Sequence, residues 1–139
     1  MEVETRYVTI NSRAQHDIID ITGAIEIEIS STSIKNGIVN IFCPGSTGAI
    51  TTIEYESGLK QDIADFLEKI IPYNKNYKHH QTWGDDNGSG HLQSALLKTS
   101  FTVPIVNGKL TLGTWQQIIF CECDTRGRSR RLVVQILGK

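Results

Sequence analysis

The chain has 139 residues, with 14 Lys and Arg against 15 Asp and Glu, and 39% of its residues are hydrophobic. A chain of this size buries enough surface to fold as one domain, which we predict to cover residues 1–139. Its formal net charge of −1 argues against a nucleic-acid partner, because proteins that neutralise many phosphates carry a basic excess.

The first third of the chain predicts two strands, a helix and a buried strand. Alternation predicts a strand over Glu2–Ile10, and a second short strand follows at His16–Ile21. Thr22 is placed to cap a helix over Gly23–Ser33, although the Ile-Glu repeat there also fits a strand. The apolar run Gly37–Cys43, closed by Pro-Gly, is typical of a buried strand.

The next strand, predicted at Ala49–Glu54, leads into the clearest helical pattern of the sequence. Ser57 is expected to cap this helix and Pro72 to end it. Its apolar residues recur at helical spacing and form one stripe: Leu59, Ile63, Phe66, Leu67 and Ile70. From Pro72 to Gly90 the chain is polar and turn-rich, which predicts a long loop of functional or disordered character.

The last third predicts a short helix at His91–Leu97, a hairpin and three strands. The Asn-Gly pair within Val106–Lys109 is the hairpin signal. The strands are expected at Thr99–Pro104, Trp115–Cys123 and Arg131–Leu137. Because strands outnumber helices and tight turns join many neighbours, we predict an α+β fold with mainly antiparallel sheets.

The cysteines and the absence of long apolar runs bear on location. No run approaches the roughly 18 apolar residues that a membrane span needs, and the first residues lack a signal-peptide layout. Three cysteines are an odd number for a secreted disulfide framework, and Cys121 and Cys123 lie too close along a strand to bridge comfortably. We expect reduced thiols, a cytoplasmic location and no membrane partner.

Three of the four histidines fall in one polar stretch with acidic residues between them: His79, His80, Asp85, Asp86 and His91. Imidazole nitrogens and carboxylate oxygens are ligands that Zn²⁺ or Mn²⁺ uses in proteins. The spacing matches no recognised zinc signature, so a polar loop with surface histidines is the alternative. The metal candidates are His79, Asp85 and His91.

A second acidic pair, Glu54 and Glu56, lies two residues apart in the predicted strand and would share one face of it. Two carboxylates facing a cavity can act as a general acid and base or bind a metal ion. A solvated sheet edge explains the same pattern, because the opposite face is mostly apolar.

Two segments are candidates for binding an anion. The loop Pro44–Ala49 has two glycines and the hydroxyls of Ser46 and Thr47, which can hold a phosphate or carboxylate, although no P-loop motif follows. The only basic cluster comprises Arg126, Arg128, Arg130 and Arg131. Arg130 and Arg131 must leave opposite faces of a strand, so one of them can clamp a phosphate. Plain loops explain both segments as well.

The sequence from His91 onward resembles the YjbQ-like family of small proteins, often labelled secondary thiamine-phosphate synthase. The resemblance rests on Leu-Gly-Thr-Trp-Gln at residues 112–116, on Cys-Glu at 121–122 and on the arginine cluster. It extends back through Tyr77-Lys78-His79 and the acidic loop to the strand that ends in Glu54. It therefore covers nearly the whole chain.

The resemblance implies an α+β fold with mainly antiparallel sheets packed as a sandwich, two or three helices and a homotrimer. It also implies a site built from Tyr77, His79, His91 and Glu54. In many family members a histidine follows the equivalent of Pro44, where this chain has Gly45. A three-histidine metal site is therefore incomplete here, and His80, Asp85, Asp86 or water would have to complete it.

The family label implies a reaction that joins a pyrimidine pyrophosphate to a thiazole phosphate and releases pyrophosphate. Such a reaction needs phosphate ligands, for which Ser46, Thr47 and Arg130 are the candidates, and usually a divalent ion such as Zn²⁺, Mn²⁺ or Mg²⁺. His79, His91 and Glu54 are the catalytic candidates.

The leading hypothesis is a metal-assisted enzyme acting on a phosphorylated or other anionic metabolite. One alternative is a metal-dependent hydrolase with Glu54 as its base. The other is a non-catalytic trimeric protein that binds a metabolite or assists a partner.

Overall fold

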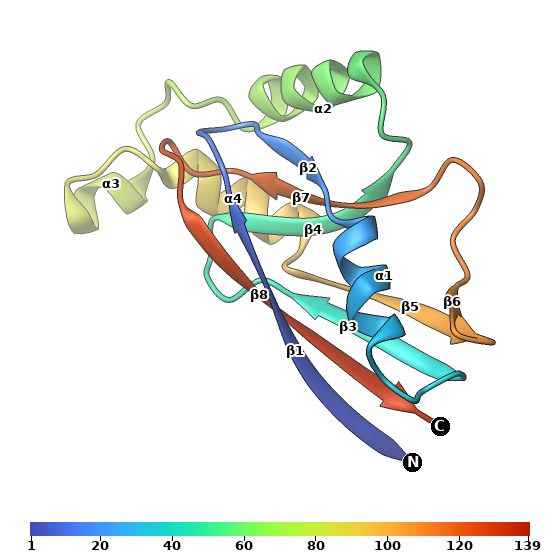
Figure 1. Ribbon diagram of the computed structural model, residues 1–139. Helices are drawn as coiled ribbons and strands as arrows, with labels where there is room; N and C mark the ends of the chain where they lie inside the picture. Colours follow the sequence, from blue (N-terminus) through green and yellow to red (C-terminus); the bar gives the residue numbers. More distant parts are fainter.

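A computed structural model describes residues 1–139 and contains eight strands and four helices (Figure 1). The larger sheet has the strand order β1-β8-β3-β5-β6, with the bounds β1 Glu2–Asn11, β8 Ser129–Gly138, β3 Gly37–Phe42, β5 Ser100–Val106 and β6 Lys109–Leu110. The smaller sheet has the order β2-β7-β4, with the bounds β2 Ile18–Asp20, β7 Gln117–Glu122 and β4 Gly48–Ile53. Every strand pair is antiparallel, which confirms the predicted α+β fold with antiparallel sheets.

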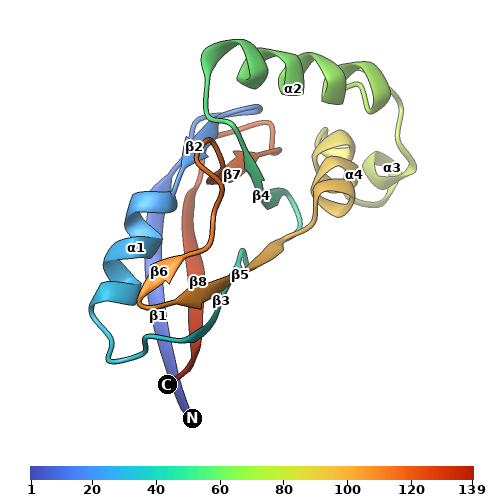
Figure 2. The same cartoon turned by 90° about the vertical axis from the view of Figure 1, so that its right-hand side faces the viewer.

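The smaller sheet is buried on both faces. Ile118 and Phe120 of β7 belong to the main core, shared with the larger sheet and with α1 (Thr22–Ser30). Ile119 and Cys121 point the other way, into a second cluster under α2 (Ser57–Ile70). Because both faces are covered, the four residues of β7 between Gln117 and Glu122 are all apolar. Figure 2 shows α2 lying across the end of the smaller sheet, with α3 and α4 beside it.

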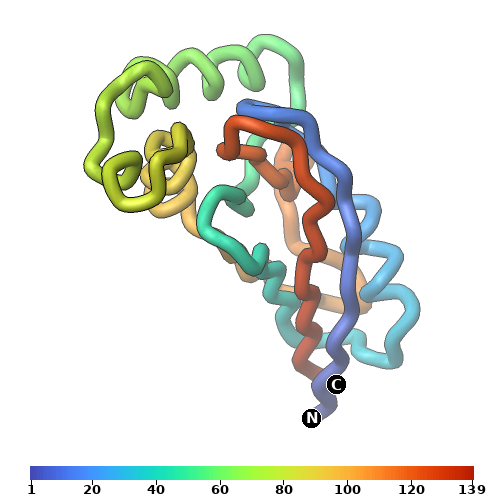
Figure 3. Tube along the Cα trace, turned by 90° about the vertical axis from the view of Figure 1, so that its left-hand side faces the viewer, coloured from blue at the N-terminus to red at the C-terminus, as the bar shows by residue number.

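The larger sheet is covered on one face only. In β8, buried residues alternate with exposed or half-buried ones, so the sheet has one core face and one outer face. The outer face exposes large apolar side chains: Tyr7, Ile38, Phe42 and Val106. The long strands β1 and β8 run side by side, with Glu2 opposite Gly138, so the two termini meet (Figure 3).

The helix α2 begins where predicted, but its cap differs from the prediction. The Glu56 carboxylate accepts hydrogen bonds from the backbone N–H groups of Gly58 and Leu59, so Glu56 and not Ser57 caps the helix. The strand β4 ends before Glu54, so the predicted pairing of Glu54 and Glu56 on one strand face is wrong. Of the predicted stripe, Leu67 is buried, whereas Phe66 and Ile70 are exposed.

The helix α1 starts and ends earlier than predicted. It covers Thr22–Ser30, and Thr22 is its first residue rather than its cap. The Thr22 hydroxyl instead accepts a hydrogen bond of 2.8 Å from the backbone N–H of Ile118, which ties the helix to β7. Thr22 therefore bonds to a residue of another element instead of capping its own helix.

The segment Pro72–Gly90, predicted as a loop, contains helical structure. It holds α3 (Lys78–Trp83) and the start of α4 (Gly88–Leu97), which brings the helices to four rather than the two or three expected. The hairpin between β5 and β6 is confirmed, with Asn107 and Gly108 at φ values of 52° and 76°. All three cysteines are free, and no helix is long and apolar enough to cross a membrane.

Candidate functional site

Two histidines from different helices meet at one end of the molecule. His79 of α3 and His91 of α4 have ring centroids 4.3 Å apart, tilted by 53°. Asp85, in the turn between the helices, places its Oδ2 atom 3.4 Å from Nε2 of His79. The fold therefore brings together His79, His91 and Asp85, the three residues that the sequence nominated as metal ligands.

Several buried polar atoms in this region lack a hydrogen-bond partner. Oδ1 of Asn87 and Oγ of Ser89 have none, and Nε2 of His79 has only the Asp85 carboxylate, 3.4 Å away, outside hydrogen-bond geometry. The only other such side-chain atoms of the chain are the two amide atoms of Gln15. Because burying a polar atom without a partner costs free energy, the first turn of α4 is a natural place for a ligand to bind.

The pKa of His91 is lowered from its ordinary value, first by burial and then by the neighbouring His79 ring. Asp124 and Asp85 oppose this shift, and Arg128 adds to it. A neutral imidazole at pH 7 is a proton acceptor, so His91 has the protonation state that a general base needs.

The neighbouring polar residues are already engaged. Nε2 of His80 accepts a hydrogen bond of 3.0 Å from the Gly88 backbone N–H, so this ring fixes the start of α4. Asp86 accepts bonds from Tyr73 and Thr125. The Tyr77 hydroxyl donates to the carbonyl of Pro72. His80, Asp86 and Tyr77 therefore position the two short helices.

The helix α4 is docked closely on the smaller sheet. A Cβ atom at Gly90 would lie 2.3 Å from the carbonyl oxygen of Cys123, so only glycine allows this approach. Further along the helix, the Ser94 hydroxyl donates to the carbonyl of Gly48 in β4. These contacts place His91 next to the turn between β7 and β8, which carries the arginine cluster.

Arg130 and Glu122 form a buried ion pair beneath this turn. Glu122 is fully buried and Arg130 is 7% exposed. Nε of Arg130 donates to Glu122 Oε1 at 3.0 Å, and Nη2 donates to Oε2 at 2.5 Å. Nη2 also donates to the Thr47 hydroxyl at 3.0 Å. The ion pair therefore links β8 to the loop between β3 and β4.

Asp124 forms the second carboxylate of this network. Its Oδ2 atom accepts bonds from Nε of Arg128 at 2.8 Å and from the Thr47 hydroxyl at 3.0 Å. Burial alone would raise the pKa of Asp124, but the Thr125 backbone N–H, the Arg128 guanidinium and the Thr47 hydroxyl together hold it below its ordinary value. Asp124 is therefore ionised and fixes the direction of Arg128.

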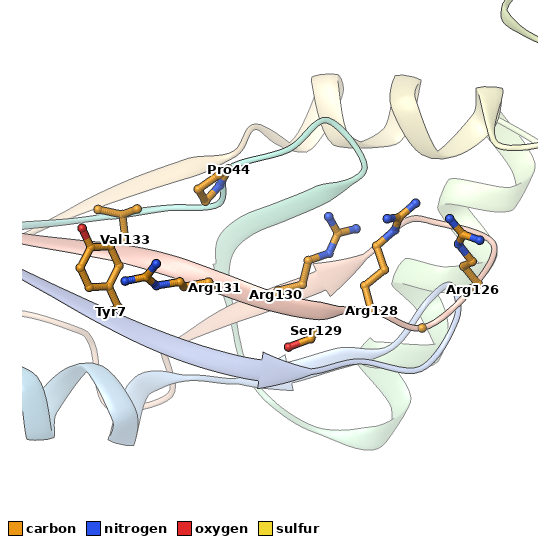
Figure 4. Close-up of a pocket in the computed structure, with 9 residues that line it drawn as sticks. Tyr7, Pro44, Arg126, Arg128, Ser129, Arg130, Arg131 and Val133 are labelled. Carbon is orange, nitrogen blue, oxygen red and sulfur yellow. The ribbon is translucent and has the colours of Figure 1, made fainter. Parts of the chain in front are cut away.

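A pocket of about 730 Å³ opens over this network, and the arginine cluster lines it (Figure 4). Figure 4 shows the guanidinium groups of Arg126, Arg128 and Arg130 on one side of β8, whereas Arg131 lies along Tyr7. The Arg131 guanidinium is 3.8 Å from the centre of the Tyr7 ring. Arg130 is buried and Arg131 exposed, which confirms that the two leave opposite faces of the strand.

The remaining predicted site residues have different positions. Thr47 is buried within the network, where its hydroxyl is engaged by Asp124 and Arg130, whereas Ser46 is exposed. Glu54 is exposed and follows the end of β4 that pairs with Gln117. It lies roughly 20 Å along the strand from Gly48, the end that contacts α4, at about 3.3 Å per residue. One chain therefore does not bring Glu54 to the two histidines.

The sequence did not nominate Glu122 and Asp124, although both belong to the site. The sequence does contain a pattern that could have identified them. Both carboxylates alternate with cysteines at the end of an apolar strand, and four arginines follow shortly after. The chain also has no group of three His, Cys, Asp or Glu side chains arranged to hold a metal ion.

Comparison with known proteins identifies the family. The profile described as "UPF0047 protein YjbQ-like" matches residues 6–139. The chain belongs to this family. A UPF0047 protein from Methanothermobacter thermautotrophicus is 41% identical over 139 residues, which is 100% of this YjbQ-like chain and 95% of that protein. A UPF0047 protein from Archaeoglobus fulgidus is 42% identical over 130 residues, 94% of this chain and 98% of its own.

Solved structures share the fold of this YjbQ-like protein. The crystal structure of a "YbjQ-like protein of unknown function" from Sulfolobus solfataricus has a TM-score of 0.89 and 34% identity, and the match covers 99% of this chain and 100% of that one. A hypothetical protein from Aeropyrum pernix has a TM-score of 0.91 and 32% identity over 98% and 99% of the two chains.

Proposed function

We propose that this YjbQ-like protein is an enzyme that acts on a small anionic metabolite, with His79 and His91 as its proton-transfer pair. The observation that carries the proposal is the pair of imidazole rings of His79 and His91, whose centroids lie 4.3 Å apart, with the Asp85 carboxylate 3.4 Å from Nε2 of His79. Two imidazoles beside a carboxylate are groups that transfer a proton in general acid–base catalysis.

The chemistry assigned to each residue follows from its surroundings. His91 accepts a proton from the substrate or from a water molecule, because its lowered pKa keeps it neutral at pH 7. His79 lies between His91 and Asp85, so it can pass the proton on while the carboxylate stabilises an imidazolium. The basic pocket over the β7–β8 turn supplies positive charge for the anionic part of the substrate.

The family resemblance implies a divalent metal ion, but the side chains of this chain do not form a complete set of ligands for one. His79, His91 and Asp85 approach one another, but no three such side chains are arranged for one ion, and His80 is engaged by Gly88. We therefore assign the proton transfer to the imidazoles and route no step through a metal ion.

Thiamine-phosphate synthase activity is the named reaction to test, because both of its substrates carry phosphate groups. The alternative hydrolase with Glu54 as base would need a second subunit to bring that carboxylate to the histidines. Three free cysteines fit the reducing cytoplasm, which we propose as the location of the protein.

Purified wild type, His91→Asn and His79→Asn should be assayed for thiamine phosphate formation, with metal content measured on the same samples. We expect activity to fall at least about 100-fold in His91→Asn, which is the usual effect of losing a general base. Glu54→Gln is the matched control. Activity that is unchanged in His91→Asn but lost in Glu54→Gln would favour the alternative with Glu54 as base over this proposal.

We also propose that the protein assembles as a homotrimer through the outer face of the larger sheet. That face exposes Tyr7, Ile38, Phe42 and Val106, and contiguous apolar surface is a common feature of subunit interfaces. Light scattering on wild type and Phe42→Glu tests this. A wild-type protein that is monomeric at all concentrations would contradict the trimer.

A further inference from the structure

We propose that the pocket between the β3–β4 loop and the β7–β8 turn binds a phosphoryl group, held by Nη1 of Arg130 with Arg126 and Arg128 at its sides. The proposal rests on the proposed function and deepens it by naming the substrate class as a phosphate monoester or pyrophosphate. It is carried by the hydrogen bonding, the charge and the shape of the pocket.

Hydrogen bonding leaves one nitrogen of each inner arginine free. Arg130 uses Nε and Nη2 for Glu122 and Thr47, and its Nη1 has no acceptor in the protein. Arg128 uses Nε and Nη2 for Asp124 in the same way. Arg130 is only 7% exposed as a whole, but its Nη1 atom is not one of the fully buried polar atoms that lack a hydrogen-bond partner. This nitrogen is therefore the part of Arg130 that a ligand can reach.

The position opposite Nη1 is a glycine in an unusual backbone conformation. Gly45 has a φ of +123°, a region that favours glycine, and a Cβ atom there would lie 3.3 Å from Arg130 Nη1. Any larger side chain at position 45 would cover the nitrogen. Gly45 is thus the residue that leaves this nitrogen uncovered.

The charges of the pocket favour an oxyanion with more than one negative charge. Three guanidinium groups, those of Arg126, Arg128 and Arg130, lie on one side of β8, and the two carboxylates below, Glu122 and Asp124, neutralise two of them. Arg126 and Arg131 have no acidic partner. A phosphoryl group has three acceptor oxygens for these fixed donors, whereas a carboxylate has two. Donors already held in place also lose little entropy on binding.

The pocket volume of about 730 Å³ exceeds what a lone phosphate needs, so the rest of a metabolite fits as well. Gly90, the residue before His91, packs against the carbonyl oxygen of Cys123, at the start of the turn that carries Arg126 and Arg128. A metabolite held by its phosphoryl group on Arg130 therefore lies over the turn against which α4 packs.

Isothermal titration calorimetry with inorganic phosphate at low ionic strength tests the site. Arg126→Gln removes an exposed, unpartnered charge and should fold normally, and we expect it to bind phosphate about tenfold more weakly. Arg13→Gln, an exposed arginine outside the pocket, is the matched control and should bind like the wild type. Arg130→Lys, checked for folding by circular dichroism, should lose most of the binding.

Three results would each overturn the assignment. The first is the absence of saturable binding of phosphate to the wild type. The second is equal affinity in the wild type, Arg126→Gln and Arg13→Gln. The third is acetate binding as tightly as phosphate. His91→Asn should keep its phosphate affinity. Phosphate binding without turnover would therefore refute the proposed enzyme and leave the site standing, whereas turnover without phosphate binding would refute the site alone.

Discussion

Buried polar groups beneath the β7–β8 turn and at the start of α4 differ in how completely their hydrogen bonds are satisfied. Beneath the β7–β8 turn, the carboxylates of Glu122 and Asp124 are almost fully buried, and each accepts several hydrogen bonds. At the start of α4, Asn87 and Ser89 each bury a polar atom that has no hydrogen-bond partner.

The difference separates support from binding. A buried ion pair whose hydrogen bonds are satisfied adds little net stability but fixes geometry, and breaking it is costly. A buried polar atom without a partner carries its desolvation cost in the free protein and gains a bond when a ligand arrives. We therefore regard the network as the scaffold and the first turn of α4 as the reactive part. The predictions below test this division, starting with the largest effect.

Glu122→Gln should cause the largest loss of stability. The substitution leaves the Arg130 guanidinium buried without its counter-charge, which typically costs about 3–5 kcal/mol in the free energy of unfolding. Urea denaturation measures it. The double variant Glu122→Leu with Arg130→Met should recover part of the loss, because neither member of this pair then leaves an unpaired buried charge. A loss below about 1 kcal/mol in Glu122→Gln would show that the pair is not a scaffold.

Asp124 should make stability depend on acid pH. Its pKa is lower in the folded protein than in the unfolded chain, so its stabilising contribution is complete above about pH 4 and is lost as the pH falls below that. Urea denaturation gives the free energies of unfolding of wild type and Asp124→Asn at pH 7 and at pH 3. The two proteins should differ most at pH 7, by about 1.5–3 kcal/mol. Asp62→Asn, an exposed carboxylate, is the control. Parallel pH curves for wild type and Asp124→Asn would contradict the role.

Glu56 and Glu54 form a matched pair for a smaller effect. Glu56→Ala removes the cap of α2 and should cost about 0.5–2 kcal/mol, whereas Glu54→Ala should leave stability unchanged. Thermal unfolding of both variants checks the difference. Equal losses would mean that the cap contributes nothing.

Two buried serines of α4 give the sharpest comparison. The Ser94 hydroxyl donates to the Gly48 carbonyl, whereas the Ser89 hydroxyl has no partner. Ser94→Ala should cost about 0.5–1.5 kcal/mol, and Ser89→Ala should be neutral or slightly stabilising. Both changes favour the helix alike, so the difference between them reports the hydrogen bond. A destabilised Ser89→Ala would show that its hydroxyl has a structural role.

The sequence predicted the elements whose patterns are local. The strand Glu2–Ile10, the Asn-Gly hairpin and the helix after Glu56 all agree with the structure, because alternation, turn chemistry and helical spacing are each written in adjacent residues. The helix α3 was missed, since its six residues are too few for a helical stripe to be visible. The start of α1 was shifted because Thr22 bonds to β7 rather than capping its own helix.

The site was predicted in part, for the same reason. His79, Asp85 and His91 lie within one short segment and do meet. The link from Arg130 to Glu122 and Thr47 joins residues of three elements, and β7 and β8 belong to different sheets, so no strand register predicts it. The separation of Glu54 from the histidines likewise depends on which end of β4 faces α4.

The place of β8 in the larger sheet has a consequence for synthesis on the ribosome. This strand lies between β1 and β3, yet it follows both in the sequence, so neither can find its central neighbour until β8 has left the exit tunnel. Until then β1 has no partner strand at all and exposes unpaired backbone groups along its length. We therefore expect this sheet to close late and slowly, and the growing chain to be most prone to aggregation just before it does.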